Sequence, residues 1–140
     1  MKLNQATDYA FRIVLYLSRK KAGEIIEARQ ISEQENIPIR FLLKTIRLLT
    51  HADIVKSFRG LKGGYALAKP PADITLRDVV EAVEGPVKIN KCLMDGSECN
   101  KDATGWCPIH KALRNIQINM NEELDKYNFA DLLNNIKTKN

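Results

Sequence analysis

The sequence has no long hydrophobic run. No stretch of its 140 residues approaches the roughly 20 consecutive apolar residues that span a bilayer. The amino-terminal segment also lacks an apolar signal core, because Asp8 and Arg12 interrupt it. We therefore expect no membrane partner and a cytoplasmic location.

Cysteine is scarce, and histidine is scarcer. The three cysteines are an odd number and follow no secretory signal, so a disulfide framework is not expected. In a reducing compartment, clustered thiols more often bind metal or do redox chemistry. With only two histidines, His51 and His110, the chain offers no acid–base pair and no nucleophile–base set, so we expect no enzyme.

Internal repeats are missing too, and the length is that of one ordinary domain. What the chain does have is an uneven charge. Its net charge is +5, and six cations with a single anion between residues 37 and 62 account for all of it. A positive excess confined to one segment indicates a surface for a polyanion, and a solvated basic face is the alternative.

The basic segment contains a helix-turn-helix pattern. Periodic apolar residues predict three helices, over residues 5–20, 28–35 and 40–52. The apolar set of the third helix is Phe41, Leu42, Ile46 and Leu49. Pro38 places a turn before this helix, and Arg40, Lys44 and Arg47 share one of its faces. A short helix, a tight turn and a helix with a basic face are typical of DNA-binding proteins.

A β-hairpin is expected next. Residues 54–58 alternate like a strand, and residues 65–68 can pair with them. The segment 59–64 between them holds three glycines, which permit a tight turn. It lacks a Walker lysine followed by serine or threonine and precedes a strand, which argues against nucleotide binding. The predicted fold is mostly α with a small β-hairpin wing.

The second half of the chain predicts a long dimerisation helix. The run from Thr75 to Asp78 fits a capping box, and Gly85 with Pro86 ends the helix that it starts. Another helix begins at Pro108 and carries a coiled-coil-like seam, with packing on its own domain as the alternative to a homodimer. The seam residues are Ile109, Leu113, Ile116, Met120, Leu124 and Tyr127.

Three parts of the chain follow from these patterns. We expect a winged helix-turn-helix DNA-binding domain over residues 1–84 and a ligand-holding loop over residues 85–107. A dimerisation helix and tail then occupy residues 108–140, with a last short helix over residues 129–136.

The cysteines share that loop. Cys92, Cys99 and Cys107 have the spacing C-x6-C-x7-C, and His110 follows three residues later. Structural zinc sites usually include a close pair such as C-x2-C, which is missing here. Loosely spaced thiolates suit a cluster of several iron atoms, and a zinc site and a redox-reactive thiol remain the alternatives.

Over nearly its whole length the chain resembles the Rrf family of winged-helix transcriptional regulators. The likeness is to the iron–sulfur branch, which includes IscR, NsrR and RirA. It rests on the opening run 7–10, the wing 59–65, the helix start 74–80 and the three cysteines.

The resemblance implies a cofactor and its ligands. Cys92, Cys99 and Cys107 match the three cluster-binding cysteines of the family. The fourth ligand is an aspartate from the other subunit in one branch, matched by Asp8, and a histidine in another, matched by His110. Asp8 is favoured over His110 as the fourth ligand, and a four-iron cluster is favoured over a two-iron cluster.

The resemblance also implies the DNA contacts. Arg40, Phe41, Leu43 and Lys44 match base-contacting positions, and Arg59 matches a wing residue that reaches the minor groove. The basic face and the wing add Arg47, Gly60 and Lys62.

The implied protein is a homodimeric repressor. It would bind a palindromic double-stranded operator and sense nitric oxide, redox or iron–sulfur status. The alternative is a zinc- or thiol-based winged-helix regulator without a cluster.

Overall fold

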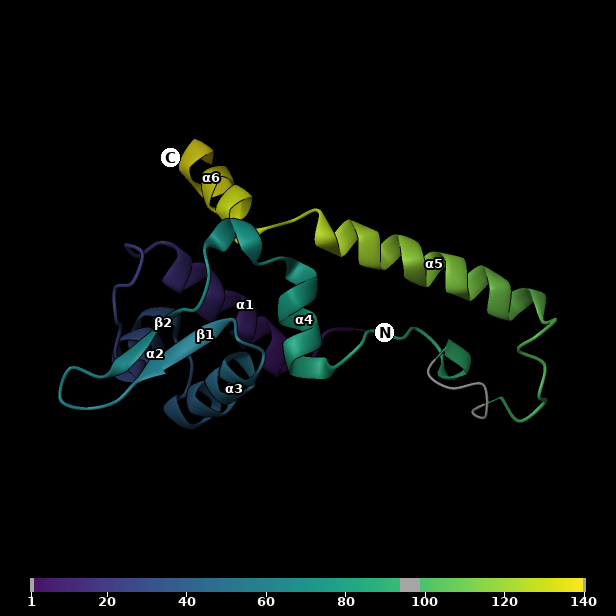
Figure 1. Cartoon of the computed structure of the whole chain (residues 1–140), viewed down its shortest axis with the longest axis horizontal. Helices are drawn as coiled ribbons and strands as arrows, with labels where there is room; N and C mark the ends of the chain where they lie inside the picture. Colours follow the sequence, from purple (N-terminus) through teal and green to yellow (C-terminus); the bar gives the residue numbers. More distant parts are fainter. Residues whose placement is uncertain (1, 94–98, 140) are drawn as a thin grey trace.

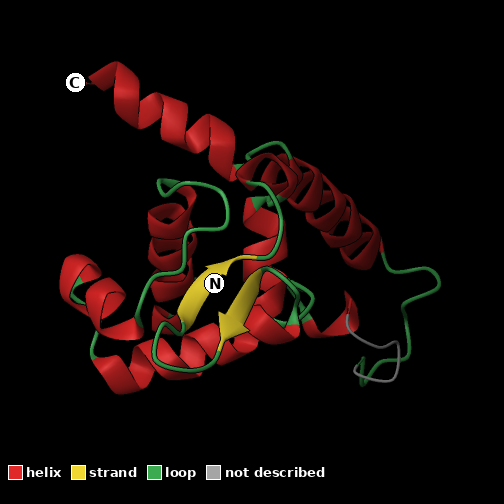
Figure 2. Ribbon diagram, turned by 60° about the vertical axis from the view of Figure 1, so that its left-hand side comes forward, coloured by secondary structure: helices red, strands yellow, loops and turns green. Residues whose placement is uncertain are grey.

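The structure is a computed structural model that describes residues 2–93 and 99–139, so the part of the predicted loop over residues 94–98 lies outside the described residues. The predicted fold class is confirmed, since helices surround one antiparallel hairpin (Figures 1 and 2). The helices of the first half are α1 (Gln5–Ser18), α2 (Ala28–Glu35), α3 (Ile39–His51), the 3-10 turn η1 (Pro71–Asp73) and α4 (Leu76–Glu84). The second half contains η2 (Lys91–Leu93), α5 (Pro108–Asp125) and α6 (Phe129–Lys139).

The helix-turn-helix is set by local signals. Asn36 ends α2 in the left-handed conformation, with φ of 53°, and its backbone N–H donates to the carbonyl of Ser32. Pro38 then caps α3, because a proline at this position does not require an N–H partner. The predicted α2 is confirmed, and α3 starts and ends one residue earlier than predicted.

The hairpin pairs β1 (Val55–Phe58) with β2 (Gly64–Leu67), with Val55 opposite Leu67 and Phe58 opposite Gly64. Ile26 adds a further antiparallel bridge by exchanging two backbone hydrogen bonds of 2.9 and 2.8 Å with Tyr65. A Cβ atom on Gly64 would lie 2.5 Å from the carbonyl oxygen of Ile26. Glycine is therefore required where the hairpin joins the segment before α2.

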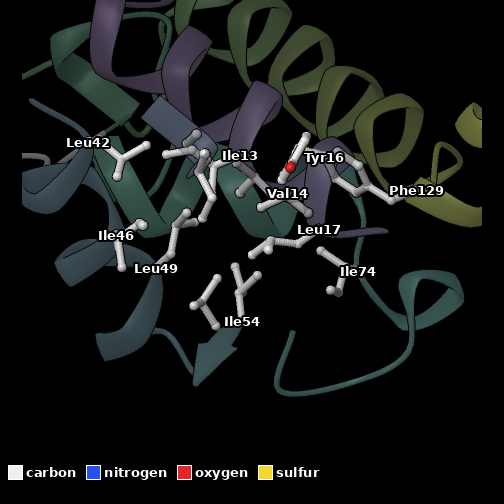
Figure 3. Packing of buried hydrophobic residues seen from close by; sticks show 14 of the residues in the cluster. Ile13, Val14, Tyr16, Leu17, Leu42, Ile46, Leu49, Ile54, Ile74 and Phe129 are labelled. Atoms are coloured by element: carbon white, nitrogen blue, oxygen red, sulfur yellow. The ribbon is translucent and has the colours of Figure 1, made fainter. Parts of the chain in front are cut away.

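The core lies between α1, α3 and the hairpin (Figure 3). Ile13, Leu42 and Leu49 are fully buried there. Phe41, which the sequence places in the apolar set of α3, is 41% exposed, whereas Leu42, Ile46 and Leu49 of the same set are buried. The Phe41 ring lies outside the core, and its centroid is 6.5 Å from that of the Tyr9 ring.

The helix α6 returns to this core. Phe129 is 1% exposed and packs in the same cluster as α1 residues (Figure 3). The backbone N–H of Leu76 donates to Tyr127, and that of Phe129 donates to Ile74, which joins the start of α6 to the start of α4. We call α1–α4, the hairpin and α6 the winged body.

The helix α5 extends away from the winged body and meets the cysteine-containing loop at its amino end (Figure 1). We call α5 with residues 87–93 and 99–107 the α5 arm. On this helix Ile109 is 65% exposed and Ile116 is 52% exposed. None of the helices in the described ranges is long and apolar enough to cross a membrane.

Candidate functional site

All three cysteines line one hollow at the amino end of α5. Cys92 lies in η2, Cys107 immediately precedes α5, and Cys99 lies in the loop between them. His110, in the first turn of α5, lines the same hollow. The structure therefore brings together four of the five residues predicted as candidate ligands.

The loop from Cys99 to Cys107 is held by backbone hydrogen bonds. The N–H of Asp102 donates to the carbonyl of Cys99, and the N–H of Cys107 donates to the carbonyl of Ala103, which is 2% exposed. Hydrogen bonds from the backbone N–H groups of Ala103 and Lys101 lower the pKa of the Cys99 thiol. The fold thus favours a thiolate at Cys99.

His110 carries an unused hydrogen-bonding atom. Its Nδ1 is buried, and it is the one buried side-chain nitrogen or oxygen in the described ranges that has no hydrogen-bond partner. Because an unpaired buried polar atom destabilises the fold, this nitrogen is a candidate to bind a ligand beside the cysteines. Among the described residues, however, no three histidine, cysteine or acidic side chains lie close enough to hold a single metal ion.

Asp8 lies elsewhere. It is in the first turn of α1, and its carboxylate accepts a 2.7 Å hydrogen bond from Arg12 on the exposed side of that helix. It does not line the hollow of the cysteines within its own chain. A role for Asp8 as a ligand would require a second copy of the chain.

The structure adds a clamp that the sequence did not reveal. Gln117 is 4% exposed on α5, and its Oε1 accepts a 2.8 Å hydrogen bond from the backbone N–H of Ile89. Its Nε2 donates to Asn121 at 3.2 Å. A glutamine between exposed seam residues gives no sequence signal of such a contact, because Ile89 lies 28 positions away.

Three of the predicted DNA contacts, Leu43, Arg47 and Arg59, lie together between α3 and the hairpin. The residues Leu43, Arg47 and His51 of α3 and Ser57, Arg59 and Tyr65 of the hairpin line a single cleft. Arg40 lies over the ring of Phe41 at 4.7 Å, and Lys44 is exposed on the same helix. Gly60 and Lys62 are exposed in the turn of the hairpin. The helix and the wing therefore share a cleft that carries the cations Arg47 and Arg59.

Comparisons with known proteins agree with this architecture. Residues 3–135 match the model of the Rrf2 family, described as an iron-dependent transcriptional regulator. The HTH-type transcriptional regulator NsrR of Bacillus subtilis (strain 168) is 31% identical over 138 residues, which cover 96% of this chain and 92% of the relative. These relatives are transcriptional regulators and not enzymes.

Solved structures show the same fold. IscR of T. potens superposes with a TM-score of 0.75 at 24% identity, covering 97% of this chain and 88% of that protein. CymR, the global cysteine regulator of B. subtilis, superposes with a TM-score of 0.67 at 27% identity, covering 94% and 95%. Because the family model matches most of this chain, the chain belongs to the Rrf2 family of winged-helix transcriptional regulators.

Proposed function

We propose that this regulator is a homodimeric repressor whose affinity for its operator depends on an iron–sulfur cluster held by Cys92, Cys99 and Cys107. The observation that carries the proposal is the hollow that three thiols share with His110, a histidine whose Nδ1 has no hydrogen-bond partner. Thiolate and imidazole donors fit an iron–sulfur cluster, and the family description names iron. Cysteines that are too far apart for one ion are compatible with a group containing several iron atoms.

Two residues compete for the fourth ligand position. His110 lies in the hollow of its own chain, and its free nitrogen supports ligation in cis. Asp8 is supported by the family resemblance and would come from the other subunit, leaving its ion pair with Arg12. A four-iron cluster accompanies the Asp8 arrangement in our proposal.

The chain's own residues transmit the state of this site. When bound, the cluster would supply a centre that nitric oxide, oxygen or iron scarcity can destroy. Cys107 joins the loop to the first turn of α5. Gln117, in the middle of the same helix, holds Ile89 through the clamp hydrogen bond. When the thiolates are released, the clamp is an attachment that remains between the loop and α5. Loss of the cluster contacts therefore loosens the start of the dimerisation helix.

DNA reading is assigned to the winged helix-turn-helix in residues 1–84. The face of α3 that carries Arg40, Lys44 and Arg47 enters the major groove, where arginine and lysine read guanine. Arg59 follows the backbone into a narrow minor groove. Two copies joined through residues 108–140 read two half-sites, so the operator is roughly palindromic. Residues 85–107, which connect the DNA-binding domain to the dimerisation helix, hold the cluster.

The deciding experiment is an absorption spectrum with iron and sulfide analysis on protein purified without oxygen. Broad absorbance near about 400 nm with matching iron and sulfide supports the cluster, and the iron count separates two-iron from four-iron forms. Asp8→Ala and His110→Ala identify the fourth ligand, with His51→Ala as the control histidine because it lies in the α3–wing cleft. Unchanged operator affinity after cluster removal refutes the sensing role.

The role of the wing has its own measurement. If Arg59 reads the minor groove, Arg59→Ala weakens specific binding by about 1–3 kcal/mol. Equal loss for all sequences would make Arg59 a phosphate contact only.

A thiol-based regulator is the second candidate. The lowered pKa of the Cys99 thiol favours a reactive thiolate, and CymR shares the fold. Colourless protein whose operator affinity changes with peroxide and returns with a dithiol reductant would favour this candidate. One zinc per chain would favour a zinc-stabilised form.

A further inference from the structure

The turn of the hairpin carries an apolar side chain that contacts nothing in its own chain. Leu61 has an exposed fraction of 103%, the highest of the large apolar residues in the described part of the chain. The turn projects beyond the helices of the winged body (Figure 1). Leu61 therefore adds nothing to the core and is free to contact a partner.

The geometry of the turn is fixed. The backbone N–H of Gly63 donates to the carbonyl of Gly60 at 3.0 Å, so residues 60–63 form a closed turn with Leu61 and Lys62 at its tip. Gly60 has φ of +103°, and a Cβ atom on Gly63 would lie 2.5 Å from the carbonyl oxygen of Phe58. The two tip side chains, Leu61 and Lys62, are both exposed.

The surroundings of Leu61 are positively charged. Between Val55 and Leu67 the hairpin contains Lys56, Arg59 and Lys62 and no acidic residue. Arg59 also lines the cleft that the hairpin shares with α3. Arg59 thus links the cleft to the turn, because it is the residue immediately before Gly60.

We propose that Leu61 is an apolar wedge that enters the DNA minor groove beside Arg59 and discriminates against G·C pairs under the wing. This inference rests on the proposed DNA-binding role. The minor groove of A·T pairs presents acceptors only, whereas guanine adds a protruding amino group that a leucine side chain cannot hydrogen-bond. Apolar wedges of this size are a recurring device of minor-groove binding, and they leave the salt dependence to the neighbouring cations.

The experiment uses the full-length protein and a duplex that the wild-type protein selects from randomised DNA. Leu61→Ala should weaken binding to this duplex about tenfold, as the loss of a largely buried leucine contact predicts. The slope of affinity against salt should stay unchanged. Lys62→Ala is the matched control in the same turn, and it should lower that slope by about one. Leu61→Met should bind nearly as well as the wild type, because it keeps an apolar side chain.

Base substitution tests the discrimination. Replacing the A·T pairs that the wing protects by G·C should weaken wild-type binding, and inosine·C, which lacks the amino group, should restore it. Leu61→Ala should lose most of this discrimination, and Lys62→Ala should keep it.

Other outcomes overturn the inference. If Leu61→Ala binds the selected duplex as tightly as the wild type, the wedge is refuted and DNA binding itself stands. If that variant loses binding to phosphatidylglycerol vesicles alone, the tip serves an anionic membrane surface. If the wild type selects no duplex, the proposed function fails first.

Discussion

In the winged body, residues such as Ile13 and Leu49 are closed off from solvent, whereas on the α5 arm Ile109 and Ile116 stay more than half exposed. The winged body has a buried apolar core that its own helices and hairpin form. The α5 arm leaves Ile109 and Ile116 of its apolar stripe exposed, and the buried Nδ1 of His110 has no hydrogen-bond partner. The body is stabilised by its own core, and the arm offers surfaces that a second copy or a cofactor would complete.

The largest expected effect tests whether α6 belongs to the winged body. Phe129→Ala removes a fully buried ring from the core, so we expect the free energy of unfolding to fall by about 3–5 kcal/mol. Urea denaturation at a fixed protein concentration measures it. Lys126→Ala, on the exposed end of α5, should leave the unfolding midpoint unchanged. A Phe129→Ala protein that unfolds like the wild type would place α6 with the arm instead.

The next effect concerns the arm. Ile116→Glu puts a charge on the exposed stripe, and we expect the dimer dissociation constant to rise at least about thirtyfold, equivalent to about 2 kcal/mol. Analytical ultracentrifugation measures this shift. Ile118→Glu is the matched control, because Ile118 is also exposed but lies on the opposite side of the helix. Equal dissociation of both variants would show that the stripe is not the seam.

Local sequence signals predicted the elements of the body well. Thr75 and Asp78 form the expected capping box, and α4 stops before Gly85. The first helix ends at Ser18, two residues before the predicted end, since the polar run after it offers no further apolar contact. Such features depend on neighbours in sequence, which is why periodicity and caps reveal them.

Contacts between distant segments could not be predicted. Phe129 is buried where its backbone N–H donates to Ile74, 55 positions earlier, and Phe41 is exposed although its neighbour Leu42 is buried. At the candidate site, the spacing of the cysteines predicted a shared loop, but the unpaired Nδ1 of His110 and the Gln117 clamp appear only in three dimensions. The difference in burial between the winged body and the α5 arm is therefore known only from the structure.

The Gln117 clamp gives a smaller effect within the arm. Gln117→Ala leaves the N–H of Ile89 without its acceptor, so we expect local opening of this segment to become easier by about 1.5 kcal/mol. Hydrogen exchange at the Ile89 amide measures the opening. Asn121→Ala is the control, because Asn121 contacts the other end of the Gln117 amide and not Ile89. The free energy of unfolding of the winged body should not change, and a matching global loss would contradict the separation of body and arm.

The smallest effect lies where the two regions join. The Nη1 of Arg77 on α4 and Asp125 at the end of α5 are 2.9 Å apart, but both side chains are at least a third exposed. Asp125 and Glu81 raise the pKa of Arg77, and after Asp125 is changed the guanidinium, which is charged in any case, keeps Glu81 as a partner. Asp125→Asn should therefore cost only about 0.2–1 kcal/mol in urea unfolding, and high salt should remove the difference. A loss well above this range would mean that the ion pair, rather than the backbone bridge of Leu76 and Tyr127, fixes the arm to the body.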